Sequence, residues 1–199
     1  MSVNYTGLKN TIKDILARTD IPDTAFDVFV STVEQDIRTN LQTLELEDMY
    51  EADIEDGSVE LPSDYQKSRV VMVNDVPLTQ TDPQSFFENK YNNNFTTIGN
   101  KMYFGGGVQG NRVKILYVKF LDGLSATNGE NAITKWYPNL YIFGLLREAS
   151  YYIDDKERAS VYEQRFTDAL DLAGIQEDHK RYSGSRLVAT GASTIVEGM

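Results

Sequence analysis

The chain has 199 residues, a length that suits one domain or one domain with a tail. Its 19 Lys and Arg residues against 30 Asp and Glu leave a net charge of −11, which repels phosphate and disfavours a DNA-binding module. No cysteine and a single histidine exclude disulfides, thiolate nucleophiles and Cys-ligated metals, and they leave little metal or triad chemistry. The absence of an apolar run of about 18 residues or of a leader predicts a soluble chain with no membrane partner.

Two helices are predicted at the start of the chain. Apolar residues at helical spacing predict a short helix over residues 4–18, which residues 19–22 interrupt. A longer stripe then predicts a second helix over residues 23–44, with Phe26, Val30, Val33, Ile37, Leu41 and Leu44 on one face. Such a stripe is more typical of a core or subunit interface than of a cofactor site.

An antiparallel β-rich region is predicted over residues 46–121. The Asp56-Gly57 pair suits a tight turn, so we expect a hairpin around residues 55–58. A β-branched run at 69–73 predicts a strand, which a turn at Asn74-Asp75 connects to another short strand. We also expect a brief helix over 85–91, and strands over 96–104 and 112–120 that pair with each other across a glycine loop.

The glycine loop at residues 105–110 matches the letters of a dinucleotide fingerprint. That chemistry needs a helix directly after the loop, where its N-terminus meets the pyrophosphate, but here a strand is predicted to follow. The loop therefore favours a hairpin connection, and we expect no cofactor.

Residues 45–64 contain nine acidic residues and no lysine or arginine. The spacing fails for an EF-hand, because counting back from Gly57 places Ala52 where the first aspartate ligand belongs. We expect a solvated acidic edge that discourages aggregation between strands, with a loose surface cation site as the alternative.

A helical hairpin and a polar arm are predicted at the C-terminal end. Trp136-Tyr137-Pro138 opens a helix over 135–153, and after the break at Asp154-Asp155 a second apolar stripe predicts a helix over 156–173 that ends before Gly174. Residues 179–199 have too few apolar side chains to pack by themselves, so we expect an arm that orders only against a partner.

Catalytic interpretations of these residues are weak. His179 lies beside Lys180 and Arg181 outside any apolar pattern. The neighbouring carboxylates of Asp154 and Asp155 favour a helix junction, because adjacent side chains on a helix point apart, whereas glycan hydrolysis needs two carboxyls facing each other across a sugar. We expect no catalytic residues and no enzyme activity.

Six segments, in their order along the chain, carry a family resemblance. They are residues 59–65 (VELPSDY), 74–78 (NDVPL), 136–138 (WYP), 146–152 (LREASYY), 162–170 (YEQRFTDAL) and 183–187 (SGSRL). Together they resemble the head-to-tail adaptor proteins of tailed bacteriophages, also called head-completion or tail accessory proteins. The resemblance runs from about residue 7 to residue 187.

The resemblance implies a structural protein with an α+β fold, in which a bundle of about four helices carries an inserted antiparallel β-rich region and an extended C-terminal tail. Residues 1–178 would form one adaptor domain and 179–199 a C-terminal arm. In that family, copies form a ring, usually of twelve, that binds the portal protein, presents a platform for tail or nozzle proteins and extends the channel for double-stranded DNA. The protein would then belong to the virion neck, after assembly in the host bacterial cytoplasm.

Two sets of residues are candidates for these roles. Tyr182, Arg186 and Leu187 are expected to bind the portal, since aromatic, arginine and aliphatic side chains suit a groove in a partner. An acidic channel wall offers DNA no counterion-releasing contacts, so the DNA passes without specific binding, and the expected channel-facing residues are Glu51, Asp53, Glu55 and Asp56. The alternatives are a carboxylate-dependent cell-wall glycan hydrolase and another connector or tail-completion binding module.

Overall fold

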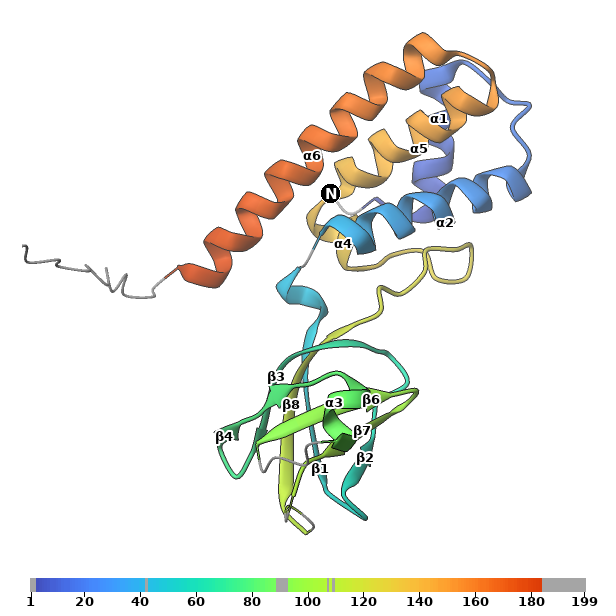
Figure 1. The fold of residues 1–199 in the computed structure, drawn as a ribbon. Helices are drawn as coiled ribbons and strands as arrows, with labels where there is room; N and C mark the ends of the chain where they lie inside the picture. Colours follow the sequence, from blue (N-terminus) through green and yellow to red (C-terminus); the bar gives the residue numbers. More distant parts are fainter. Residues whose placement is uncertain (1–2, 42, 89–92, 107, 109, 184–199) are drawn as a thin grey trace, which may run out of the picture.

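The computed structural model describes residues 3–41, 43–88, 93–106, 108 and 110–183. Two parts of different secondary structure make up this molecule, a helical body and a β-module (Figure 1). The chain passes from the body into the β-module through residues 41 and 43–46 and returns through residues 120–131. The predicted α+β fold, with a β-rich region inserted into a helical bundle, is confirmed.

The helical body contains α1 (Tyr5–Leu16), α2 (Asp23–Asn40), α4 (Ala132–Trp136), α5 (Pro138–Tyr152) and α6 (Lys156–Tyr182). The β-module contains β1 (Glu47–Asp53), β2 (Ser58–Glu60), β3 (Tyr65–Val73), β4 (Val76–Pro77), β5 (Thr79–Gln80), α3 (Pro83–Glu88), β6 (Asn94–Ile98), β7 (Lys101–Phe104) and β8 (Arg112–Lys119). A single 3-10 turn (Leu44–Leu46) leads into β1. The helix expected over 85–91 is α3, and residues 89–92 lie outside the described part of the chain.

Each part has its own hydrophobic core. In the body, apolar stripes of α1, α2 and α5 meet around the fully buried Leu8, Val33 and Leu145. In the β-module, the facing sides of two sheets bury Met102, Ile115 and other side chains. That residues 1–178 form one domain stays a prediction.

The structure differs from the prediction at the end of the second helix and in the helix predicted over residues 135–153. The second helix ends at Asn40 rather than at 44, because Leu41 is extended and the backbone N–H of Leu44 donates to a side chain of α6. The helix expected over 135–153 is two helices, α4 and α5. Tyr137 between them leaves the helical region (φ −134°, ψ 52°), as expected for a residue that precedes proline.

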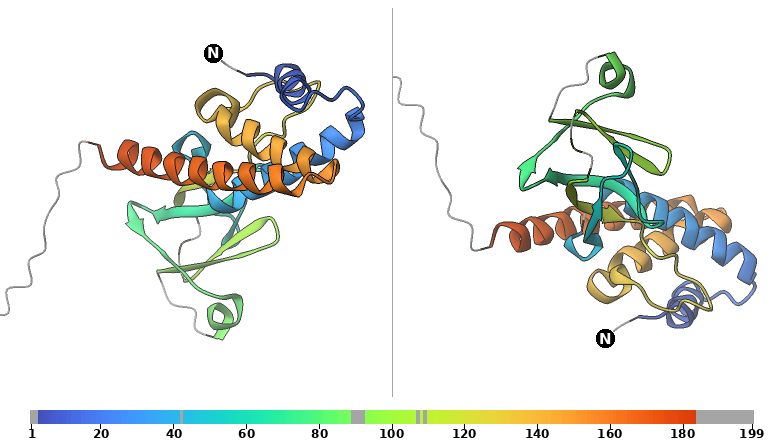
Figure 2. Two further views of the ribbon diagram at one scale, coloured as in Figure 1. Left: turned by 90° about the horizontal axis from the view of Figure 1, so that it is seen from above. Right: turned by 90° about the horizontal axis from the view of Figure 1, so that it is seen from below.

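The last helix is nine residues longer than predicted. Helix α6 continues through Gly174 to Tyr182, so the predicted end at 173 is wrong and the first residues of the expected arm are helical. A glycine inside a helix costs about 1 kcal/mol. Glu177, which lies beyond Gly174, is buried and accepts hydrogen bonds from Leu44 and Tyr137, and these contacts outweigh that cost. Helix α6 runs past the other helices of the body, and its C-terminal end lies at the edge of the molecule (Figures 1 and 2).

The β-module is built from two four-stranded sheets, with strand orders β1-β8-β3-β4 and β2-β7-β6-β5. The pairs are antiparallel except for β5 with β6. The expected pairing of 96–104 with 112–120 is wrong. Gly99, at φ 62°, lets the first segment reverse on itself as the β6–β7 hairpin, whereas β8 lies between β1 and β3 of the other sheet.

Both predicted tight turns are present, but only one closes a hairpin. Asn74 and Asp75 adopt φ values of 50° and 62° between the paired strands β3 and β4. Asp56 and Gly57 also have positive φ, yet β1 pairs with β8 and β2 with β7, so a single bridge between Glu55 and Ser58 is all that remains of the expected hairpin. This turn therefore connects the two sheets.

Replacing either of two glycines of the helical body by alanine should change the free energy of unfolding, in opposite directions. A Cβ on Gly144 in α5 would lie 2.7 Å from Val33 Cγ1 and 3.2 Å from the ring of Phe166, so Gly144→Ala should lower the free energy of unfolding by about 1–3 kcal/mol. A Cβ on Gly174 meets no atom within 4 Å, so Gly174→Ala should raise it by about 0.5–1 kcal/mol. Urea denaturation of the two variants measures both, and equal effects would contradict the close packing of α5 against α2.

Candidate assembly surfaces

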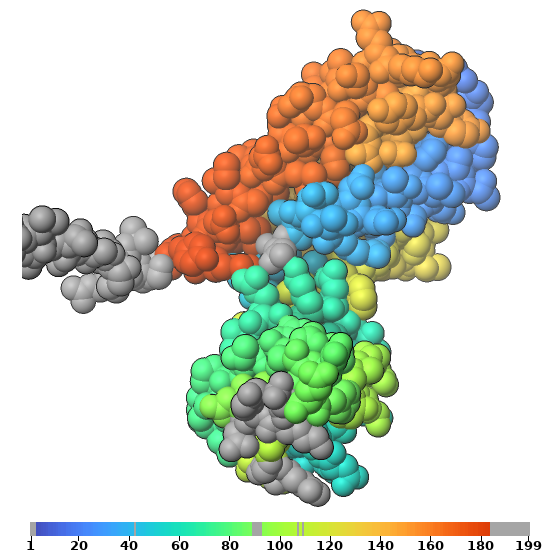
Figure 3. Space-filling view, viewed as in Figure 1, coloured from blue at the N-terminus to red at the C-terminus, as the bar shows by residue number. Residues whose placement is uncertain are grey.

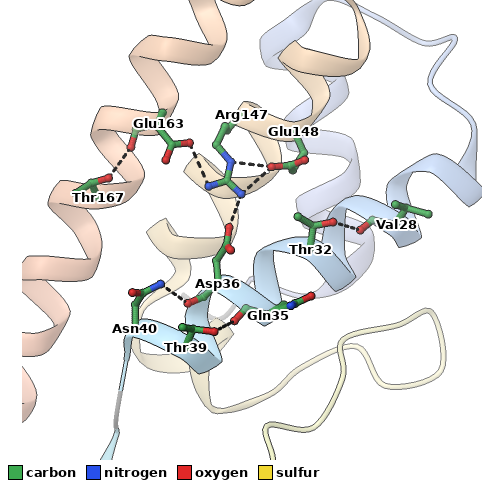
Figure 4. Close-up of polar contacts among 10 residues, drawn as sticks. All are labelled: Val28, Thr32, Gln35, Asp36, Thr39, Asn40, Arg147, Glu148, Glu163 and Thr167. Carbon is green, nitrogen blue, oxygen red and sulfur yellow. Dashed lines mark hydrogen bonds and ion pairs between the residues drawn. The ribbon is translucent and has the colours of Figure 1, made fainter.

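A buried arginine joins three helices of the body (Figure 4). The side chain of Arg147 on α5 is 8% exposed, and it donates to Asp36 of α2 at 2.6 Å, to Glu148 at 2.7 Å and to Glu163 of α6 at 3.2 Å. Its guanidinium also lies 4.9 Å from the centre of the Phe166 ring. Burial alone would lower the pKa of Arg147, but the carboxylates outweigh it and raise the pKa.

A buried glutamate on α2 holds the segment that returns from the β-module. Glu34 accepts hydrogen bonds from the backbone N–H of Leu124 at 2.6 Å and from the hydroxyl of Tyr141 at 2.8 Å. The Asn131 amide donates to the same hydroxyl, while its oxygen caps α4. Burial raises the pKa of Tyr141, and the negative charge of Glu34 raises it further, so the phenol stays a donor.

A second buried glutamate, on α6, holds the segment that enters the β-module. Glu177 accepts hydrogen bonds from the backbone N–H of Leu44 at 2.7 Å, from Lys180 at 2.8 Å and from the hydroxyl of Tyr137. We call Leu44, Tyr137, Glu177 and Lys180 the junction cluster. Burial tends to raise the pKa of Glu177, but the three donors overcome it, and the pKa lies below its ordinary value.

The next turn of α6 reaches the first strand of the β-module. Arg181 contacts Glu47 of β1 at 2.8 Å, and the same carboxylate lies 3.5 Å from Arg69 of β3. The C-terminal end of α6 is therefore attached to β1 directly, and to β3 only through the carboxylate of Glu47.

The four predicted acidic residues lie together at the end of β1 and in the turn that follows it. Glu51, Asp53, Glu55 and Asp56 are all exposed. Glu51 pairs with Arg112 at 3.0 Å, and the other three line a shallow hollow of about 410 Å³ that also contains Lys101. Glu47 differs from them, since its side chain is 13% exposed and ion-paired. That the four acids face a DNA channel stays a prediction.

The predicted portal-binding residues are only partly described. Tyr182 occupies the last helical position of α6 and is 62% exposed. Arg186 and Leu187 lie outside the described residues, as does the rest of the expected arm after 183.

The residues considered for catalysis or metal binding lie at a helix junction or on the exposed surface. Asp154 adopts φ 59° between α5 and α6, and Asp155 caps α6 by accepting the N–H of Arg158 at 3.0 Å, so the predicted helix junction is confirmed. His179 is exposed in the last turn of α6. Within the described ranges, no three acidic or histidine side chains gather as metal ligands. None of the helices in those ranges combines the length and apolarity needed to cross a membrane.

Sequence reasoning missed the three buried charged residues of the body, Glu34, Arg147 and Glu177. It also missed two exposed apolar residues, Trp136 at the end of α4 (46% exposed) and Leu172 on α6 (56% exposed). A signal was present for Arg147, which interrupts the apolar run of α5. Leu172 falls off the buried stripe of α6, which is also visible in the spacing of apolar residues.

A known protein family matches nearly the whole chain. The sequence model of that family, described as SU10 adaptor protein, covers residues 3–190 and thus both the helical body and the β-module. A search of curated proteins gives no match. The family match agrees with the resemblance drawn from the sequence.

The lowered pKa of Glu177 predicts a pH dependence of stability. A carboxyl group with a lowered pKa in the folded state stabilises the fold above its unfolded pKa of about 4.3, and that contribution is lost as the pH falls through the folded value. Glu177→Gln should therefore unfold more easily at pH 7, and its stability should fall less than that of the wild type on acidification from about pH 5. Urea denaturation as a function of pH measures both effects. Asp178→Asn, an exposed neighbour, is the control, and a profile like that of the control would contradict the buried role of Glu177.

Proposed function

Because the chain belongs to the SU10 adaptor family, we propose that it is a structural protein of the virion neck of a tailed phage, in which a ring of copies joins the portal to the tail. The ring extends the DNA channel, carries the portal on one side and a tail or nozzle protein on the other, and has twelve copies. We propose no catalytic role. The observation that carries the proposal is a family match that spans both structural parts of the chain.

The position of the end of α6 supports contact with a second protein. This helix ends at the edge of the molecule, away from the cores of both parts (Figure 2). Arg181, in its last turn, is bonded to β1, so the point from which the following residues leave is fixed relative to the β-module. A fixed starting point lowers the entropy that a docking segment loses on binding.

The exposed acids at the end of β1 support passage of DNA. Lys and Arg contacts with phosphates release counterions and supply most non-specific DNA affinity, and residues 45–64 contain neither residue type. The nearby cations are Arg112, which pairs with Glu51, and Lys101, which lies in the hollow with the other three acids, so the acids outnumber them. A channel lined by this end of the β-module would hold the duplex weakly and let it slide.

We expect the C-terminal residues to carry binding to the portal. Deletion of residues 184–199 should leave the helical circular dichroism and the melting temperature nearly unchanged, because α6 ends before the deletion, but it should abolish co-sedimentation with portal rings. Within that segment, Arg186→Ala with Leu187→Ala should weaken binding at least tenfold, whereas Ile195→Ala with Val196→Ala serves as the matched control. Equal binding by the truncated and full-length chains would contradict a portal-binding arm.

We expect the acidic end of β1 to set the affinity for DNA. Changing Glu51, Asp53, Glu55 and Asp56 to Lys should alter the free energy of unfolding by no more than about 1 kcal/mol, as is usual for exposed sites, and should raise retention on immobilised duplex DNA at low salt. A control variant reverses four exposed acids elsewhere: Asp14, Glu88, Asp122 and Glu157. If rings assembled from the two variants retain DNA equally well, the four acidic positions at the end of β1 do not line the channel.

A further inference from the structure

Helix α6 has a narrow buried stripe and two exposed flanks. The stripe contains Ala159, Phe166, Ala173 and Glu177, which face the rest of the molecule. With 3.6 residues per turn, two sets of exposed residues lie on opposite sides of this stripe. One set is Glu163, Thr167, Asp171 and Asp178, and the other is Arg165, Leu172 and Gln176.

The first flank forms one wall of an acidic groove. This groove, of about 740 Å³, lies between α6 and the C-terminal half of α2, where the space-filling view shows a hollow (Figure 3). Phe166, Leu170 and Ile175 give it apolar lining, and Ile175 is 55% exposed. We define the acidic groove by these residues and by Asp36, Glu163, Asp171 and Asp178.

The charge of the groove is not balanced within the chain. Asp36 and Glu163 share the buried Arg147 with Glu148. Asp171 and Asp178 are exposed and form no ion pair with the described residues. The groove therefore keeps a negative charge beside an apolar lining.

The second flank forms a basic aromatic knob with the end of α4. Trp136 is 46% exposed, and the ammonium groups of Lys135 and Lys180 lie 5.3 Å and 4.9 Å from the centre of its ring. Leu172, 56% exposed, lies with Trp136 and Gln176 around a notch of about 130 Å³. We define the basic knob by Lys135, Trp136, Arg165, Leu172 and Gln176.

The cations of the knob are also unbalanced. Arg165 lies 5.9 Å from the rings of Phe143 and Tyr162, and neither Arg165 nor Lys135 forms an ion pair with the described residues. The knob thus combines a large apolar side chain with two unpaired positive charges. Tryptophan and arginine are the residue types that most often dominate the energy of a protein interface.

We propose that the basic knob of one copy docks into the acidic groove of the next copy. The charges are opposite, both surfaces have an apolar centre, and the volume of the groove lies in the range of sites that bury large organic groups. Because knob and groove face opposite sides of one helix, a chain does not satisfy its own groove. This inference rests on the proposed function, since it names the surfaces through which the ring forms.

The contact is head-to-tail, which determines what it builds. The two surfaces in contact differ, so each added copy leaves one knob and one groove free at the ends. Such a heterologous contact closes into a ring if the rotation between copies closes and otherwise grows into a filament. An isologous dimer would instead place the same surface on both sides.

Cross-linking separates these geometries, because the chain has no cysteine of its own. Gln176→Cys places one thiol on the knob and Thr167→Cys places one beside the groove, both at exposed positions. With a short bis-maleimide, a mixture of the two variants should give dimers, each variant alone should not, and the double variant should give a ladder. Dimers from a single variant alone, or no dimers from the mixture, would overturn the inference.

Sedimentation velocity of the full chain tests the energetics. Trp136→Ala should weaken self-association at least about 30-fold, the usual effect of losing a dominant interface residue. Phe87→Ala, in α3 of the β-module and 56% exposed in the wild type, is the matched control and should change nothing. Lys135→Glu and Asp171→Lys should each weaken association, and mixing these two variants should recover part of it.

The outcomes also separate this inference from the proposed ring. If the wild-type chain assembles and neither Trp136→Ala nor the cysteine pair has the expected effect, the contact lies elsewhere and the ring proposal stands. If the wild-type chain stays monomeric at every concentration and on the portal, the ring proposal fails, and this inference fails with it. Cross-linking of the Thr167→Cys thiol to the portal would assign the groove to another occupant and overturn the inference.

Discussion

Two buried carboxylates hold the points where the chain crosses between the helical body and the β-module. Glu177 accepts the N–H of Leu44 on the way into the β-module, and Glu34 accepts the N–H of Leu124 on the way back. A connecting segment that leaves regular structure exposes backbone groups that cost free energy when buried without partners. Each carboxylate satisfies such a group and ties the segment to a helix of the body.

These carboxylates stabilise the structure only as parts of complete clusters. A buried charge loses hydration, and removing one partner usually costs more than the pair contributes. Each of the two is accordingly surrounded by further donors, a tyrosine hydroxyl in both cases and a lysine or arginine beside it. Arg147 follows the same pattern with the charges reversed, and it joins α5 to α2 and α6.

The sequence predicts those features that depend on local chemistry. The turns at Asp56-Gly57 and Asn74-Asp75 are identified by residue types that tolerate positive φ, and α1 and α5 by their apolar spacing. Strand pairing depends on which sheet each strand joins, and alternation of apolar residues is the same in both sheets, so β8 was assigned the wrong partner.

The candidate surfaces show the same limit. Exposure of the acids at the end of β1 follows from their density in the sequence. Glu177 continues the helical spacing of Phe166 and Ala173 and Asp178 does not, but the helix end predicted before Gly174 removes both residues from that pattern. The end of α6 was misplaced for a related reason. Gly174 favours a helix end locally, and the contacts that override it come from residues more than 120 positions away in the chain, such as Leu44 and Glu47.

Lys180 links the basic knob to the junction cluster. Its ammonium donates to Glu177 and to the hydroxyl of Tyr137, and it also lies over the ring of Trp136. A substitution of Lys180 would disturb both the attachment of the β-module and the knob, and a loss of assembly would then have two causes. Trp136 and Gln176 belong to the knob but donate no hydrogen bond to Glu177. Variants at these positions therefore change the contact between copies while the junction cluster keeps its hydrogen bonds.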